Sequence, residues 1–254
     1  MNAAVERFAE VAAAPAVDLG VAALAIGAGA DPLMDSQVWL EELDRLASGV
    51  EGVDGLVDRL FAERGFTGNV RDYSDPENSF LHRVLARRVG IPITLAVVMI
   101  EVGRRAGVGL DGVGMPGHFL VRDRADGTLL DPFDHGRPLT LAAAEERFRS
   151  TTGAGPEVVF GPPLLPVVGA HQILDRMLAN LAGAYRARGA VRDVEWVVRM
   201  RLVLPSAGPE VVRSLGEALA GQGRFQQGAE EVETRAEDDP ELLAAARALR
   251  ARLN

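Results

Sequence analysis

The chain has 254 residues, 48% of them hydrophobic, and a formal net charge of −9 at pH 7. The length predicts one large or two modest domains. The acidic balance argues against nucleic acid as a general partner, because phosphate binding needs a cationic surface. The absence of cysteine excludes disulfides, thiolate metal sites and cysteine nucleophiles together.

Neither a secretory signal nor a membrane span is expected. The N-terminal segment carries acidic residues early and lacks a basic region. The longest apolar run, about residues 91–100, is shorter than the roughly 20 residues that cross a bilayer. We therefore expect a cytoplasmic protein without a membrane partner.

The first part of the chain, about residues 3–63, is expected to be a helical preamble without catalytic residues. Asp18 is the expected N-cap of its second helix, and Gly65 ends its last one. Apolar side chains at helical spacing predict helices over residues 3–14, 19–26, 35–48 and 53–63.

Two helices follow the loop at residues 66–75. Asn78 or Ser79 is the expected cap of a helix over residues 80–88. Pro92 then stands where a first helical turn tolerates proline, and a helix is predicted over about residues 93–106. This second helix is apolar on most sides at its start, so we expect it to be central and buried.

A β-hairpin is predicted after the central helix. In residues 108–115 and 118–122, apolar and polar side chains do not alternate regularly. Strands that are buried on both faces show this pattern. Asp126-Gly127 is a strong signal for a two-residue turn, and residues 129–131 would form the returning strand.

The C-terminal part is predicted to be purely helical. Thr140 is the expected cap of a helix over residues 141–149, and the glycine- and proline-rich residues 151–168 are interpreted as a surface linker. Residues 169–254 would form a second domain that ends in a helix at 241–253. Within it, Leu181-Ala182, Tyr185 and Gly189 are followed at a spacing of 34 residues by Leu215-Gly216, Leu219 and Gly223. This is the tetratricopeptide period, matched in part.

His118 and Asp131 are the sharpest candidates for chemistry. They would lie near the open end of one hairpin, where cross-strand neighbours have Cβ atoms about 5 Å apart, so a hydrogen bond between them is feasible. A carboxylate in that position would fix the tautomer of the imidazole. The plainer alternatives are a buried structural histidine and an aspartate that caps a turn.

No clear nucleophile accompanies this pair. Thr94, in the first turn of the central helix, is the nearest hydroxyl, although a helical threonine more often bonds back to a carbonyl. A metal site built from His118, Asp131, Asp134 and His135 can be drawn, but its spacing is only permissive, so neither a metal nor a cofactor is expected. His82 and His171 are interpreted as helix-surface residues.

The sequence resembles the SirB-type transglutaminase-like proteins that carry C-terminal tetratricopeptide repeats. Several separate blocks carry the resemblance in the right order along nearly the whole chain. They are Tyr73-x-Asp75-Pro76-x-Asn78-Ser79-x-Leu81, Gly90-Ile91-Pro92-Ile93-Thr94-Leu95, Pro116-Gly117-His118-Phe119-Leu120-Val121, Asp131-Pro132-Phe133, and Ile173-Leu174-x-Arg176-Met177-Leu178-x-Asn180-Leu181.

The resemblance implies an α+β fold with a papain-like core, in which a central helix packs against a small antiparallel sheet. Residues 1–150 would form this domain. His118 and Asp131 take the histidine and aspartate positions of the family's active members, while the cysteine position falls at about Pro92. A substrate or partner pocket is expected at Asn78, Pro92 and Met115.

These expectations favour a degenerate enzyme that acts as a binding or regulatory protein and retains a His–Asp pair without its thiol. The alternative is a hydrolase or acyl/amide transferase in which His118, oriented by Asp131, acts as general base. A third possibility, a scaffold whose helical repeats bind a protein or peptide segment, supplements the first.

Overall fold

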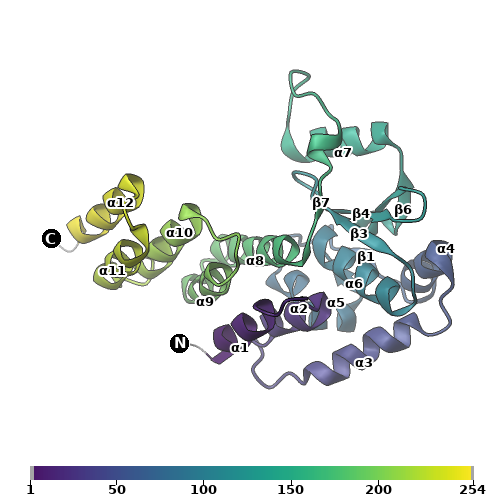
Figure 1. The fold of residues 1–254 in the computed structure, drawn as a ribbon, viewed down its shortest axis with the longest axis horizontal. Helices are drawn as coiled ribbons and strands as arrows, with labels where there is room; N and C mark the ends of the chain where they lie inside the picture. The colour runs from purple at the N-terminus through teal and green to yellow at the C-terminus, as the bar shows by residue number, and fades with distance from the viewer. Residues whose placement is uncertain (1–2, 253–254) are drawn as a thin grey trace.

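The computed structural model describes residues 3–252. Figure 1 shows a small sheet with helices on both sides and a row of helices that leads away from it to the C-terminus. The helix-rich mixed architecture with a small antiparallel sheet is the one expected from the sequence.

The helical preamble forms as predicted. Its helices are α1 (Ala3–Ala12), α2 (Leu19–Gly27), α3 (Ser36–Ala47) and α4 (Gly52–Val57), and α4 continues as a π-helical turn over Asp58–Glu63. Asp18 caps α2, because its side chain accepts a hydrogen bond of 3.0 Å from the backbone N–H of Val21.

The prediction that Asn78 or Ser79 caps the next helix is wrong. Both lie in a 3₁₀ turn, Pro76–Ser79, and α5 (Leu81–Arg87) follows Phe80 without a side-chain cap. The Asn78 side chain is fully buried and binds Asn69 together with two backbone carbonyls of the preceding loop. A buried amide needs partners on all sides, so it is used for the loop rather than for the helix.

The central helix is α6 (Pro92–Arg105), with Pro92 as its first residue, and most of its side chains are buried. It packs against the sheet through β3 (Leu110–Val113) and β4 (Leu120–Asp123). The remaining strands are β5 (Leu129–Asp131), β6 (Arg137–Leu139) and β7 (Val167–Val168). The strand order is β6-β5-β4-β3-β7, and every neighbouring pair is antiparallel.

A separate short ladder joins the loop before α5 to the residues before α6. Here β1 (Thr67–Gly68) pairs in parallel with β2 (Val89–Gly90), which the sequence did not predict. Two-residue strands carry too little periodicity to be found from a pattern. The ladder fixes the backbone that leads into α6.

The hairpin between β4 and β5 is confirmed, but its details differ. Its loop covers residues 124–128, so Asp126 and Gly127 belong to a longer connection than a two-residue turn. Gly127 has a φ of +82°, which explains the glycine. His118 lies in the turn two residues before β4 and not on the strand itself.

The segment interpreted as a linker is tied to the first domain. It follows α7 (Leu141–Thr152), which Thr140 caps as predicted. Arg149 donates hydrogen bonds to carbonyls of this segment at Gly155 and Val158. Its last two residues form the edge strand β7, which pairs with β3.

The C-terminal helices are α8 (Ala170–Ala187), α9 (Val191–Leu202), α10 (Pro209–Ala220), α11 (Phe225–Ala236) and α12 (Pro240–Ala251). They follow one another away from the sheet (Figure 1). The predicted closing helix at 241–253 corresponds to α12, although Leu253 lies outside the described residues.

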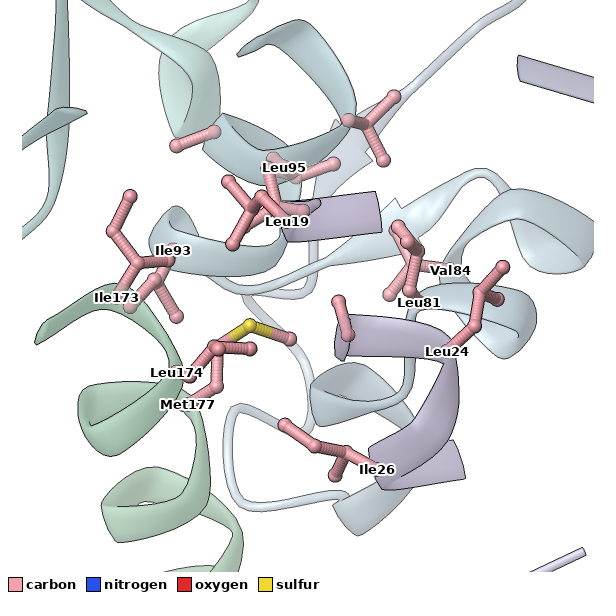
Figure 2. Close-up of a cluster of buried hydrophobic side chains, with 14 of the residues drawn as sticks. Leu19, Leu24, Ile26, Leu81, Val84, Ile93, Leu95, Ile173, Leu174 and Met177 are labelled. Atoms are coloured by element: carbon pink, nitrogen blue, oxygen red, sulfur yellow. The ribbon is translucent and has the colours of Figure 1, made fainter. Parts of the chain in front are cut away.

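The first C-terminal helix belongs to the core of the N-terminal part. Figure 2 shows Ile173, Leu174 and Met177 of α8 beside Ile93 of α6 and Leu19 of α2. All are buried in one continuous hydrophobic cluster. The same cluster continues into α9, whereas α10 to α12 pack in two separate clusters. The boundary of the core therefore lies beyond the boundary that composition alone suggests.

His82 is not the helix-surface residue that the sequence predicts. Its side chain is 3% exposed, and neither ring nitrogen has a hydrogen-bond partner within residues 3–252. Its ring lies near those of Trp39 and Phe80. A Cβ placed on Gly27 would stand 2.5 Å from its Nδ1, so the glycine leaves room for the imidazole. Burial lowers the pKa of His82 from 6.5 to about 4, with Arg83 adding to the effect.

Acidification is expected to destabilise the protein through His82. Below about pH 6.5 the unfolded chain binds a proton at this side chain and the folded chain does not. Stability is therefore lost as the pH falls from 6.5 towards 4. At about 1.36 kcal/mol per pKa unit, the loss approaches roughly 3 kcal/mol.

Urea unfolding of the wild type and of His82→Leu, each at neutral pH and near the lower limit of this range, measures the effect. The variant is expected to lose less stability than the wild type on acidification. His135→Gln is the control, because His135 is exposed. A His82→Leu protein that loses as much stability as the wild type would overturn the assignment.

Candidate functional site

The structure brings His118 and Asp131 together. His118 stands at the end of a tight turn, where its backbone N–H donates to the carbonyl of Met115 at 3.2 Å and Gly117 has a φ of +74°. Asp131 is the last residue of β5. The Nε2 atom of His118 lies 2.9 Å from Oδ1 of Asp131. The predicted hydrogen bond is confirmed.

Both partners are withdrawn from solvent: His118 is 4% exposed and Asp131 is not exposed. The same Oδ1 of Asp131 also accepts the backbone N–H of Phe133 at 3.0 Å. The ring of Phe133 meets the imidazole edge to face, with 6.0 Å between centroids. The pair is therefore held by the backbone and covered by an aromatic side chain.

Two arginines that sequence reasoning missed complete this site. Nη2 of Arg147, from α7, lies 3.4 Å from Oδ2 of Asp131, an atom without a hydrogen-bond partner in the described part of the chain. Nη2 of Arg176, from α8, donates to the backbone carbonyl of His118 at 2.7 Å. Neither helix is part of the hairpin, so only the folded chain reveals these contacts.

The contact with Asp131 determines which ring nitrogen of His118 can act as a base. When Asp131 is ionised, its carboxylate accepts hydrogen bonds and donates none, so a neutral His118 then carries its proton on Nε2. The basic nitrogen is then Nδ1, for which residues 3–252 offer no hydrogen-bond partner. Such a ring could accept a proton at Nδ1 from a group that reached it.

Thr94 is engaged in backbone hydrogen bonds. Its hydroxyl donates to the carbonyl of Asn78 at 2.7 Å and accepts the N–H of Ile91 at 3.1 Å. The side chain is fully buried. These bonds tie the first turn of α6 to the loop before α5, and they give the hydroxyl a structural use.

The three residues expected to line a pocket are all buried. Asn78 lies in the hydrogen-bond network of the loop before α5, and Pro92 begins α6. Met115 packs in a smaller hydrophobic cluster that includes Val113 and Phe148. A pocket at these residues stays a prediction.

The alternative metal site is not formed. Within the described part of the chain, no group of three or more histidine, aspartate or glutamate side chains could hold a metal ion. His135 turns away to Thr67, whose hydroxyl lies 3.4 Å from its Nε2. Separately, no helix in residues 3–252 has the length and apolarity needed to cross a membrane.

Comparison with known proteins gives relatives of this chain in bacteria and animals. A UPF0162 protein of Xylella fastidiosa (strain Temecula1) is 41% identical over 171 residues, which are 65% of this chain and 59% of the relative. A UPF0162 protein of Pseudomonas aeruginosa is 33% identical over 62% of this chain and 58% of the relative. F-box only protein 21 of Mus musculus is 34% identical over 51% of this chain and 21% of its own length.

The chain thus matches about three fifths of the length of these bacterial relatives. No solved structure matches it. The family profile described as the transglutaminase-like superfamily matches residues 33–179, from just before α3 into α8. These residues contain the central helix, the sheet, His118, Asp131 and both arginines of the site. The chain belongs to the transglutaminase-like superfamily.

Proposed function

We propose that this chain is a transglutaminase-like protein of the SirB type that has lost its catalytic thiol and serves as a binding or regulatory protein. The observation that carries the proposal is a buried His118–Asp131 pair in a chain without cysteine. Pro92 takes the position at which the resemblance implies the cysteine, and a proline side chain has no group to donate or to attack with. The hydroxyl of Thr94 is occupied by backbone groups.

The proposed partner is a protein or peptide segment that binds the helices α8 to α12 as degenerate tetratricopeptide-like repeats. Gly189 and Gly223, which are 34 residues apart in the sequence, have φ angles of +68° and +77°. Each lies in the turn that joins two consecutive helices. This equivalence supports a repeated helix–turn–helix unit.

The alternative function is a hydrolase or acyl/amide transferase with His118 as general base. One observation favours it: Nδ1 of His118 has no hydrogen-bond partner among the described residues. The 4% exposure of the side chain argues against it, because a base must meet the proton that it removes.

Nuclear magnetic resonance of the imidazole nitrogens tests the proposal. We expect the Nε2 signal of His118 to report its hydrogen bond with Asp131 and to change in Asp131→Asn. His118→Gln identifies its signals, and His135, which is exposed, provides a solvent-accessible comparison. The purified protein is expected to turn over no acyl or amide substrate. Hydrolysis that His118→Gln abolishes and His135→Gln leaves intact would overturn the proposal in favour of the alternative.

A further inference from the structure

A cavity of about 240 Å³ lies where the loop before α5 meets α8. Tyr73, Ser74 and Ser79 line it from the loop side, and Asn180 and Gly183 line it from α8. Ile91, the residue before Pro92, also lies in its wall. The cavity therefore adjoins the beginning of the central helix, at the contact between the sheet-bearing core and the C-terminal helices.

The polar groups of this cavity lack partners. Ser79 is 2% exposed, and its hydroxyl makes no hydrogen bond within residues 3–252. The side-chain amide of Asn180, which is half-buried, also makes no hydrogen bond within these residues. By contrast, the neighbouring Asn78 uses its side chain fully, with bonds to Asn69 and two carbonyls. The hydroxyl of Ser79 and the amide of Asn180 are therefore available to a ligand that enters the cavity, which is a first indication of a binding site.

Gly183 is a second, independent indication. It lies inside α8, where glycine costs about 1 kcal/mol relative to alanine. A Cβ at this position would meet no atom within 4 Å, so packing does not require a glycine. The bare backbone leaves the cavity open on the side of α8. A glycine inside a helix that packing does not require is typical of a functional position.

We propose that this cavity binds an uncharged amide group of a peptide main chain. No charged side chain lines it, and its hydroxyls and carboxamide can each donate and accept, as an amide N–H and C=O require. Its volume is below the roughly 300–1,000 Å³ of pockets for whole drug-sized ligands, so it suits one anchoring group. The inference rests on the proposed function and specifies where the peptide partner is anchored.

The cavity is also connected to the His118–Asp131 pair. The ring of Tyr73 meets that of Phe133 at 6.1 Å between centroids, and Phe133 in turn meets His118 at 6.0 Å. A ligand that moves Tyr73 would therefore be sensed at the imidazole through one intervening ring. The hydroxyl of Tyr73 is neutral at physiological pH and can donate a hydrogen bond. Burial raises its pKa, and the charge of Arg176 opposes this effect.

Titration with N-acetylalanine N-methylamide, a blocked residue with two amide groups and no charge, tests the proposal by nuclear magnetic resonance. The side-chain amide of Asn180 and the backbone signal of Gly183 are expected to shift with millimolar affinity. Gly183→Leu fills the cavity and should weaken binding more than tenfold. Gly55→Leu is the matched control, because Gly55 also lies in a helix with no atom within 4 Å of its Cβ and does not line this cavity.

Ser79→Ala provides a second variant that removes one hydroxyl and should weaken binding several-fold even if Gly183→Leu folds poorly. An absence of saturable shifts in the wild-type protein would overturn the proposal, and so would equal affinity in the wild type, Gly183→Leu and Ser79→Ala. The outcome is separable from that of the proposed function. A protein that binds the probe and also hydrolyses amides through His118 keeps the anchor site and loses the binding-protein proposal.

Discussion

Ending the chain at residue 168 is expected to unfold the entire protein, whereas ending it at residue 207 is expected to leave a folded core. The first cut removes α8, whose buried side chains complete the cluster that α2 and α6 share (Figure 2). Five of them are large and nearly or fully buried: Ile173, Leu174, Met177, Leu178 and Leu181. At about 1.5–3 kcal/mol each, their burial equals the whole stability of a typical domain.

The second cut is the matched control. It removes α10 to α12, whose apolar side chains pack in clusters separate from that core. It retains α9, which supplies Val197 and Met200 to the core. Circular dichroism and urea unfolding of both truncated proteins measure the difference. A soluble, cooperatively unfolding protein that ends at residue 168 would show that the two parts fold independently.

Replacing Asp131 by alanine is expected to lower the free energy of unfolding by about 1–3 kcal/mol for each buried donor that loses its acceptor. The change leaves two donors without their acceptor, the imidazole of His118 and the backbone N–H of Phe133, and it removes the carboxylate that lies 3.4 Å from the guanidinium of Arg147. Asp131→Asn should cost less, because an amide oxygen can still accept the N–H of Phe133.

Asp134→Ala is the matched control for this change. Asp134 lies three residues further on, is 34% exposed and makes only long contacts of 3.6 Å and 3.8 Å with Arg137 and His135. Removing such a surface carboxylate should cost well under about 1 kcal/mol. Urea unfolding of the three variants gives the comparison. Equal losses in Asp131→Ala and Asp134→Ala would mean that the buried pair does not contribute to stability.

Local signals in the sequence predict local structure well in this protein. Asp18 and Thr140 each precede an apolar helix and cap it as expected. The pairing of His118 with Asp131 was also predictable, because a hairpin brings the ends of its two strands together whatever the rest of the fold. The position of His118 within the hairpin was not predictable, since His118 reaches Asp131 from a turn rather than from a strand.

Features that depend on distant contacts could not be predicted. Asn78 lies just before an apolar helix and is a residue type that often caps helices, but its burial commits it to the preceding loop. His82 is followed directly by Arg83 in α5, as a surface position could be, yet α2 and α3 cover it. Arg147 and Arg176 reach the site from α7 and α8, and nothing in their own sequence neighbourhoods points to a histidine.

The participation of α8 and α9 in the core has a consequence for how the protein is made. The cluster that contains Phe8 of α1 also contains Leu204, which is synthesised 196 residues later (204 − 8). His171 of α8 reinforces this closure, because its Nε2 lies 2.8 Å from the carbonyl of Ala12. During translation the preamble helices would leave the ribosome long before the residues that cover them. We expect their apolar faces to stay uncovered, and accessible to chaperones, until α9 has emerged.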